Sequence, residues 1–242
     1  LKVNVDSLKW PKSDENGPVH HILNAIAKRE GIGDILAEGS MRASEKIGNG
    51  TDSFAMHVKG LEMPGYEPRN LKTMALALAV STRGACHNRS SAYEHDFSER
   101  AGRLSASEKL GEVVKESEDY SAVMDSLIWC KFVRKVFDDF YQESSEILNR
   151  VTGWDVTVSE LKLCGERINN IKKMFNVREG WIREHDTLPG RILNEPIIGQ
   201  KDEEIRLNKT DLDRMIASYY DARGWTQSGY IPRSKIEELE IK

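Results

Sequence analysis

The stretch Leu71-Lys-Thr-Met-Ala-Leu-Ala-Leu-Ala-Val80 is the most continuous apolar run of the chain. It contains few β-branched residues, which favour strands, so its composition and length predict a buried helix. It is much shorter than the roughly 18 residues that a membrane-spanning helix needs. A polar segment, Ser81-Thr-Arg-Gly-Ala-Cys-His87, follows directly. We therefore expect a loop with reactive side chains at the end of the most buried helix.

Apolar residues recur at helical spacing through most of the remaining sequence. The longest such segment is 119–150, which we predict to form one long helix. The charged segment 98–118 is expected to cover the surface. Further helices are predicted at residues 19–29, 35–47, 157–175, with Ile171 and Phe175 on its apolar face, and 210–224. Strand patterns are scarce, so the predicted fold class is all-α and multihelical.

Composition describes an ordinary water-soluble protein and narrows its partners. The 242 residues are 39% hydrophobic and 31% charged, with a formal net charge of −4. This charge argues against nucleic acid or an anionic membrane as the main partner. Three cysteines without paired spacing fit a reducing compartment, so a cytoplasmic location is expected. The sequence begins at Leu1 rather than Met, and we expect it to be part of a longer protein.

The segment Asp125-Ser-Leu-Ile-Trp-Cys130 places a carboxylate five positions before a thiol. A carboxylate can accept hydrogen bonds from a bound heterocycle, and a thiolate can ligate an iron–sulfur cluster. On a continuous helix the two side chains would point roughly 140° apart, which suits two different groups better than one ion. Spacing alone favours the simpler interpretation, in which Cys130 packs in the core and Asp125 is solvated.

Residues 83–89, Arg-Gly-Ala-Cys-His-Asn-Arg, form a second candidate site. His87 could act as a general acid or base, and Arg83 or Arg89 could hold a phosphate or carboxylate. The alternative is a surface loop with a capping histidine. Three other residues or segments have structural interpretations: Cys164 is expected in the core, Asp186 is expected to cap a helix, and residues 176–181 either hold a buried Arg–Glu pair or line a pocket.

Six segments, in this order, resemble the C-terminal half of the tungsten-containing aldehyde:ferredoxin oxidoreductase family. They are Glu30-Gly-Ile-Gly-Asp-Ile-Leu-Ala-Glu-Gly39, Val58-Lys-Gly-Leu-Glu-Met-Pro-Gly-Tyr-Glu-Pro-Arg69, Ser81–His87, Asp125–Cys130, Phe175-Asn-Val-Arg-Glu-Gly180 with Asp186-Thr-Leu-Pro189, and Tyr219-Tyr-Asp-Ala-Arg-Gly-Trp225. The resemblance implies the two C-terminal helical domains of that family. Residues 1–60 would be the later part of the first helical domain and 61–242 the second, with the N-terminal β domain outside this chain.

The resemblance also implies cofactors and site residues. Family members hold tungsten between two pterins, beside a [4Fe–4S] cluster. The family motif Asp-x-x-Gly-Leu-Cys places its Asp on a pterin and its Cys on the cluster, which implies these roles for Asp125 and Cys130. Ile128 and Trp129 replace the Gly and Leu of the motif, and Trp129 would lie at the cofactor. Arg89 would contact a pterin, and His87 would assist proton transfer.

The family supplies three further cluster cysteines from a segment that this sequence does not contain. A four-thiolate cluster needs four ligands, so we expect this chain alone to hold no cofactor or an incomplete one. It would need the N-terminal part of the same enzyme, and the chain by itself would be inactive. Asp6, close to Leu8-Lys-Trp10, resembles a remnant of the sibling pterin motif.

Three functions compete at this point. The first is oxidation of aldehydes to carboxylates, with electrons passing to ferredoxin or another electron-transfer subunit. The second is the catalytic subunit of a tungsten-dependent benzoyl-CoA reductase, because residues 125–132 and 87–93 depart from the commoner aldehyde-oxidising pattern. In that case Trp129 or Tyr93 would line an aromatic pocket for an aromatic acyl-CoA. The third is an inactive helical fragment without cofactor. A homodimer is compatible with each.

Overall fold

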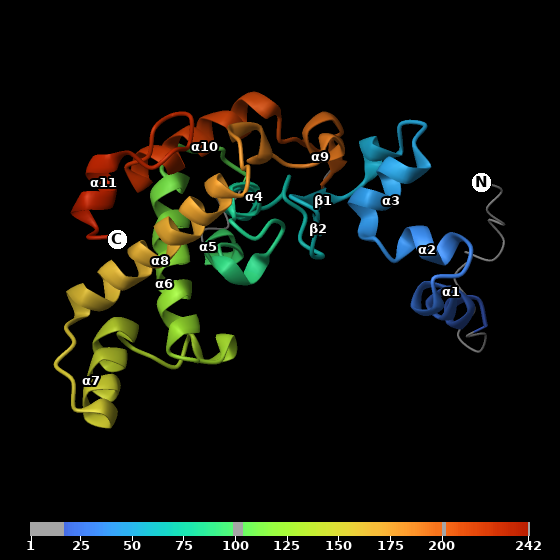
Figure 1. Ribbon diagram of the computed structural model, residues 1–242. Coiled ribbons are helices and arrows are strands. Elements are labelled where there is room, and N and C mark those ends of the chain that lie inside the picture. The colour runs from blue at the N-terminus through green and yellow to red at the C-terminus, as the bar shows by residue number, and fades with distance from the viewer. Residues whose placement is uncertain (1–16, 99–103, 200–201, 242) are drawn as a thin grey trace.

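The structure, a computed structural model, describes residues 17–98, 104–199 and 202–241. Figure 1 shows a helical protein with two small antiparallel hairpins, which confirms the all-α prediction. The α-helices in the described residues are α1 (Gly17–Lys28), α2 (Ile32–Leu36), α3 (Gly39–Ile47), α4 (Lys72–Val80), α5 (Tyr93–Ser98), α6 (Leu110–Ser126), α7 (Phe140–Thr152), α8 (Val158–Arg178), α9 (Gly190–Asn194), α10 (Lys209–Arg223) and α11 (Arg233–Glu238). The hairpins pair β1 (His57–Val58) with β2 (Leu61–Glu62) and β3 (Ile197–Ile198) with β4 (Glu204–Ile205).

Helix α4 is the centre of the main core, as its apolar sequence predicts. Each of its residues is buried, and it packs against α5, α6 and α10. Its first turn is capped from another helix: Thr73 N and Met74 N donate to the buried Asp96 carboxylate of α5 at 3.0 and 2.9 Å. A negative charge at a helix N-terminus is stabilising, so Asp96 fixes α5 against the start of α4.

Helix α6 packs against both α8 and α10, and two glycines let these helices approach closely. A side chain at Gly111 of α6 would meet the Ser218 backbone of α10 at 2.4 Å. One at Gly165 of α8 would meet Asp119 O of α6 at 2.5 Å. The fully buried Arg223 of α10 then ties two of the helices together through ion pairs to Glu118 and Asp119 of α6, at 2.7 and 2.6 Å. The charged segment 104–118 is thus partly core, contrary to its predicted surface position; residues 99–103 of that segment are outside the described part.

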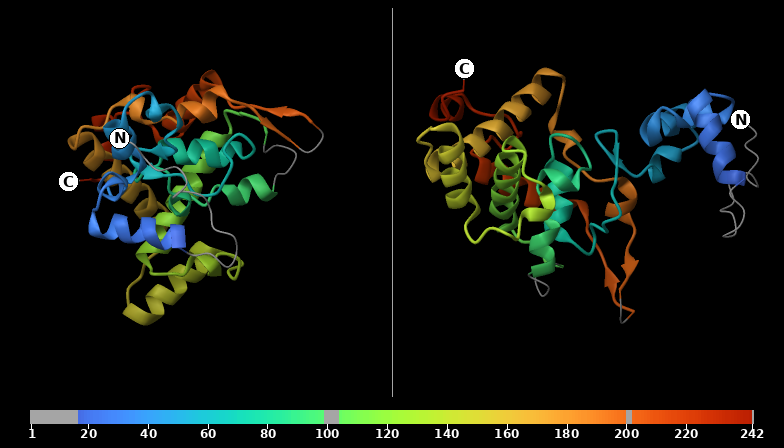
Figure 2. Two further views of the ribbon diagram at one scale, coloured as in Figure 1. Left: turned by 90° about the vertical axis from the view of Figure 1, so that its right-hand side faces the viewer. Right: turned by 90° about the horizontal axis from the view of Figure 1, so that it is seen from below.

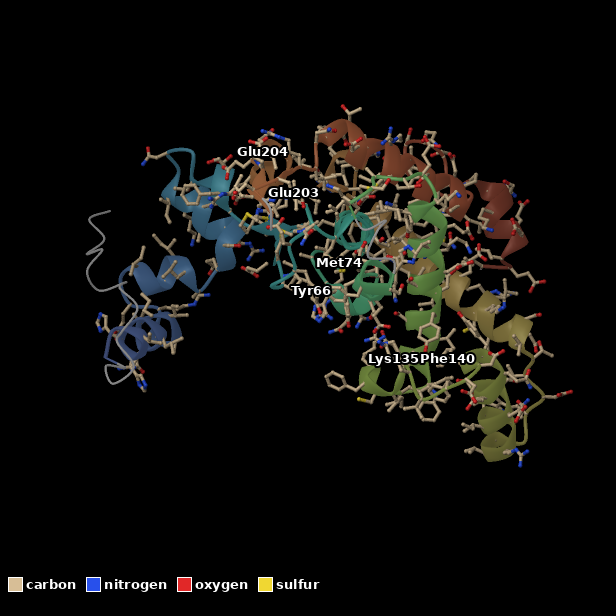
Figure 3. The ribbon with its side chains drawn as sticks, turned by 180° about the vertical axis from the view of Figure 1, so that it is seen from behind. Tyr66, Met74, Lys135, Phe140, Glu203 and Glu204 are labelled. Carbon is tan, nitrogen blue, oxygen red and sulfur yellow. The ribbon has the colours of Figure 1, made fainter. Side chains whose placement is uncertain are left out.

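The prediction of one helix over 119–150 is wrong. Helix α6 ends at Ser126, and the chain turns through a short 3-10 helix, η4 (Lys131–Val133), before α7 begins. Asp139 caps α7 by accepting from Tyr141 N and Gln142 N, both at 3.1 Å. The apolar period continues through this region, but the local cap starts a new helix. Figure 3 labels Phe140 at this turn, where the chain leaves the lower end of α6.

Helices α1–α3 pack on one another and lie apart from the core (Figures 1 and 2). They join it through the 3-10 helix η2 (Thr51–Phe54) and the β1–β2 hairpin. Figure 2 also shows the β3–β4 hairpin projecting from the body. The proposed domain division near residue 60 falls in the turn of the first hairpin, where Gly60 lies. Asp6 and residues 8–10 lie outside the described residues.

Three side chains predicted to face the core are exposed: Cys164, Ile171 and Phe175 of α8. Helix α8 is covered along one side only, because α6 and α7 pack there and its other side faces solvent. The predicted start of this helix at residue 157 is confirmed, since Thr157 is the N-cap and forms a capping box with Glu160. None of the helices in the described residues combines the length and apolar character needed to cross a bilayer.

Candidate functional site

Asp125 lies in the last turn of α6 and contacts two cations from separate segments. Arg89 Nη1 is 3.2 Å from Asp125 Oδ2, and Lys131 Nζ is 2.8 Å from Asp125 Oδ1. The Asp125 side chain keeps 32% of its exposure, so its oxygens remain accessible to a ligand. Arg89 and Asp125 are therefore brought together as the sequence resemblance implies, and Lys131 is an addition that the sequence analysis missed.

The end of α6 has the hydrogen-bond pattern of a Schellman motif. Ile128 N donates to Asp125 O at 3.2 Å, and Trp129 N donates to Met124 O at 3.0 Å. Ile128 has φ +61°, the left-handed conformation that glycine adopts most readily. The Gly of the family motif therefore corresponds to the reversing position of this turn, and Ile128 occupies it with strain. Because α6 ends before Cys130, the side chains of Asp125 and Cys130 are not related by the roughly 140° rotation expected on a continuous helix.

Cys130 lies just beyond this turn, in extended conformation before η4, and its thiol is exposed. The residues around it are exposed and apolar: Ile128 is 91% exposed and Phe132 is 96% exposed. Trp129 turns inward instead and packs edge-on against Phe137, with ring centroids 5.2 Å apart. Its buried Nε1 has no hydrogen-bond partner within the described part of the chain. The turn thus separates the carboxylate of Asp125 from the thiol of Cys130.

The loop after α4 positions both His87 and Arg89, which form the short 3-10 helix η3 (His87–Arg89). Gly84 makes this path possible: it has φ +99°, and a Cβ there would meet Val58 O at 2.4 Å. The loop therefore rests directly on the β1–β2 hairpin. Arg89 reaches Asp125 from η3, but its buried Nε has no partner among the described residues.

His87 belongs to a layer of aromatic rings. Its ring lies 5.4 Å from Tyr66 and 6.2 Å from Tyr93, and the two tyrosines stack at 4.8 Å. Burial lowers the pKa of His87, and the positive charge of Arg134 lowers it further. Arg134 is held 3.0 Å from Glu94. His87 is therefore neutral near pH 7 and able to accept a proton.

Further cations surround the Asp125 site. A cavity of about 470 Å³ is lined by Arg83, Arg89 and Lys172 together with Ile171 and Phe175. Burial lowers the pKa of Lys172, and the nearby charge of Arg89 adds to this. Burial also lowers the pKa of Lys131, although Asp125 opposes the shift. Cations outnumber Asp125 here, so the surface suits an anionic ligand such as a phosphate.

The sequence offers only a weak signal for these added lysines. Lys131 directly follows Cys130, whereas Lys172 comes from α8 and only the fold brings it near Arg89. Within the described residues no group of three His, Cys, Asp or Glu side chains is arranged to hold a metal. Cys130 is thus a single thiol beside the Asp125 site.

Asp186 occupies a second charged cluster, and its predicted helix-capping role is wrong. It is 1% exposed and accepts from Tyr220 OH at 2.6 Å and Trp181 Nε1 at 3.1 Å. Lys59 Nζ lies 2.9 Å from one carboxylate oxygen, and Lys173 Nζ lies 3.4 Å from the other. Burial opposes ionisation, but the two lysines hold the pKa of Asp186 below its usual value.

The fold and this site can be compared with known proteins. Residues 3–241 match the family described as aldehyde ferredoxin oxidoreductase, domains 2 & 3. The chain belongs to the aldehyde ferredoxin oxidoreductase family. The tungsten-containing aldehyde ferredoxin oxidoreductase of Pyrococcus furiosus is 35% identical over 229 residues, covering 92% of this chain and 36% of that protein. The enzyme of the same name from Pyrococcus horikoshii is 36% identical over 231 residues, 93% of this chain and 36% of its own length.

A solved structure shares the aldehyde ferredoxin oxidoreductase fold. The active site complex BamBC of benzoyl coenzyme A reductase, in complex with 1,5-dienoyl-CoA, superposes with a TM-score of 0.75 at 17% identity. The match covers 98% of this chain and 41% of that one. This likeness establishes the fold. The chain spans about 36% of the length of its curated family relatives, and the family model that it matches describes domains 2 & 3.

Proposed function

We propose that this chain is the C-terminal helical portion of a tungsten–bis-pterin, iron–sulfur oxidoreductase that oxidises aldehydes to carboxylates, with ferredoxin as electron acceptor. The family and the names of the 35% identical relatives support the reaction class. The observation that carries the site assignment is the Asp125 carboxylate, held by Arg89 and Lys131 on the turn that ends at the exposed Cys130.

The residues present fit the proposed cofactors. The partly exposed Asp125 can accept hydrogen bonds from pterin N–H groups, and the unpartnered Nε of Arg89 is a donor available to an anionic pterin substituent. Trp129 would lie beside the same cofactor. The exposed Cys130 thiol has the chemistry of a cluster ligand. The tungsten–pterin group supplies the redox chemistry at the aldehyde carbon when bound.

His87 is proposed to move the proton. A neutral imidazole is the form that accepts a proton, and burial keeps His87 in that form. The stacked rings of Tyr66 and Tyr93 restrict the orientation of the imidazole. The side chain therefore needs little reorganisation to act as a general base.

The remaining partners are proposals that rest on the length of the relatives. The part of the enzyme that precedes these domains would supply the other three cluster ligands. Residues 1–60 would be the later part of the first helical domain, and residues 61–242 would be the second. This chain alone would then be inactive. Ferredoxin or another electron-transfer subunit would receive the electrons in the cytoplasm, and a homodimer is compatible with the fold.

A second candidate is the reduction of an aromatic acyl-CoA. The stacked Tyr66–Tyr93 pair beside His87 favours it, because aromatic rings pack well against an aromatic substrate. The complete enzyme should be assayed with a short aldehyde plus a viologen acceptor, and separately with benzoyl-CoA plus reduced viologen. We expect aldehyde oxidation, and a His87→Gln variant should be roughly a hundredfold slower with unchanged tungsten and iron.

Each outcome of this assay has a defined meaning. Ring reduction without aldehyde oxidation would transfer the assignment to the second candidate. A preparation with full tungsten and iron that turns over neither substrate would reject both. A complete enzyme that retains neither metal would support the third function considered above, an inactive helical fragment without cofactor.

A further inference from the structure

A further cavity lies outside the Asp125 site, and several of the sequence segments that the proposed function does not use line it. It measures about 610 Å³. The β1–β2 hairpin, the loop after α4, the end of α8 and the segment before α9 form its walls. These segments come from three separate parts of the sequence, around residues 57–59, 82–83 and 176–189. Figure 1 shows the hairpin between α4 and the α1–α3 group.

The cavity is lined by a partly buried lysine in a strained backbone conformation, Lys59. Lys59 and Gly60 form the two-residue turn between Val58 and Leu61, with φ +52° and +82°. A non-glycine residue in the left-handed region is unfavourable and is retained where its surroundings hold it. Lys59 is held by two acceptors: its ammonium donates to Ala79 O at 2.6 Å and pairs with Asp186 at 2.9 Å. One of its three N–H donors is left for a ligand.

Positive charge exceeds negative charge beneath the cavity. The single carboxylate of Asp186 is shared between Lys59 and Lys173, whose side chains are 14% and 2% exposed. Lys173 also lies over the ring of Trp181, 2.9 Å from its centroid, and Trp181 forms part of the cavity wall. Burial lowers the pKa of Lys173 to about 7, so near neutral pH the surplus charge is present in part of the molecules.

The walls and rim define the size and charge of the ligand. Arg83 adds a second cation, while Val58, Trp181 and Leu188 provide apolar surface. Three exposed carboxylates, those of Asp52, Glu179 and Glu184, also line the cavity and would repel a molecule with several negative charges. Glu179 is partly neutralised by its ion pair with Arg178. A small apolar molecule with one carboxylate group would match the cations and the apolar wall, and its single charge would be repelled least by the carboxylates of the rim.

The cavity is separate from the cofactor residues. Asn176 Nδ2 donates to Thr82 O at 2.7 Å, and Thr82, Arg83 and Asn176 line both this cavity and the one that contains Arg89. These residues form the partition between the two cavities. Arg178 and Glu179 pair on the surface, which rules out the buried Arg–Glu pair, whereas Asn176, Glu179 and Gly180 line the cavity.

We propose that this cavity binds a small organic monocarboxylate, with Arg83 and Lys59 as the contacts for the carboxylate group. Binding of the anion does not depend on the cofactors. A role for the cavity in receiving the acid product rests on the proposed function, because aldehyde oxidation forms a molecule of this class.

The test is calorimetric titration of the protein with benzoate at about pH 7, where a carboxylic acid is ionised. Benzamide, which has the same shape without charge, is the matched probe. Benzoate should bind saturably and benzamide much more weakly. Arg83→Gln should weaken benzoate binding roughly tenfold, the size of a lost charge-assisted hydrogen bond. Glu184→Gln should strengthen it by roughly twofold or more, because it removes a repelling charge.

Arg191→Gln is the control, because it removes an exposed arginine whose ion-pair partner, Glu195, also lies outside the cavity lining. Its affinity for benzoate should equal that of the unaltered protein. Circular dichroism of each variant checks that the fold is retained. Absence of saturable benzoate binding, or equal affinities of the Arg83→Gln and Arg191→Gln variants, would overturn the proposal. Neither result would affect the assignment of Asp125 and Cys130.

Discussion

The backbone N–H of Trp129 donates to the carbonyl of Met124 at 3.0 Å and closes α6 in a Schellman motif. This bond reverses the chain between Asp125, which faces Arg89 and Lys131, and Cys130, which faces solvent. The proposed pterin contact and the proposed cluster ligand therefore lie on the two sides of one turn. The spacing of five residues reflects the geometry of this turn.

Ile128 sits at the left-handed position of the turn, with φ +61° and 91% exposure. Ile128→Gly should raise the free energy of unfolding by about 0.5–1 kcal/mol, because relief of left-handed strain exceeds the added entropy of the unfolded chain. Ile128→Ala keeps the Cβ and is the control. Urea denaturation compares them, and equal stabilities of the two variants would show that the turn is not strained.

Arg223 is fully buried between two carboxylates and Tyr219, whose OH accepts from Arg223 Nε at 3.0 Å. Arg223→Ala leaves Glu118 and Asp119 without this cation, so unfolding should become easier by about 3–5 kcal/mol. Arg214→Ala, which removes a half-exposed arginine of the same helix, should cost less than about 1 kcal/mol. Thermal and urea unfolding measure both; a small loss for Arg223→Ala would mean that α6 and α10 are held by apolar packing alone.

Lys173 gives the stability a defined pH dependence. Its folded pKa is about 7 because of burial, whereas the unfolded side chain titrates near 10.5. Between these values the unfolded chain holds the proton and the folded chain does not, so stability rises with pH from about 7, by up to about 1.4 kcal/mol per unit. Lys173→Met should lack this contribution. Urea denaturation over this pH range would contradict the assignment if the two proteins had parallel profiles.

Asp125 is expected to matter for cofactor retention more than for folding. Asp125→Asn in the complete enzyme should bind the pterin cofactor about tenfold more weakly, because the amide no longer accepts charge-assisted hydrogen bonds. The stability should change by less than about 1 kcal/mol, since the ion pairs are partly exposed. Tungsten content per polypeptide is the measurement, with the exposed Asp155→Asn as control. Equal tungsten in both variants would remove Asp125 from the cofactor site.

The sequence predicts the helical class and the core correctly where periodicity and burial agree. The run 71–80 is apolar on all sides and is buried on all sides. Helix α8 begins after Thr157 and α10 ends at Gly224, close to the predicted bounds. The apolar periodicity does not reveal that α6 ends at Ser126. Leu127, Val133 and Phe137 continue the apolar pattern through the turn, because they pack against a second core cluster that contains Phe140. The local signal is the Asp139 cap.

The candidate site is only partly accessible from the sequence. His87 and Arg89 stand out because polar residues follow the apolar run, and the family motif marks Asp125 and Cys130. Lys172 and Lys59 reach their sites from distant segments, and spacing along the chain contains no information on such contacts. The partners of Asp186 come from the β1–β2 turn, α8, α10 and the segment after α8. Most of these segments are distant in sequence, so the local sequence suggests only a capping residue.

Iron content of a Cys130→Ala variant of the complete enzyme tests the central claim most directly. Cys164→Ala is the matched control, because Cys164 is also an exposed thiol but lies on α8. Cys130→Ala should lose the cluster and its visible absorbance, with helix content unchanged. Cys164→Ala should keep a full iron complement. A full iron complement in Cys130→Ala would contradict the assignment of Cys130 as a cluster ligand.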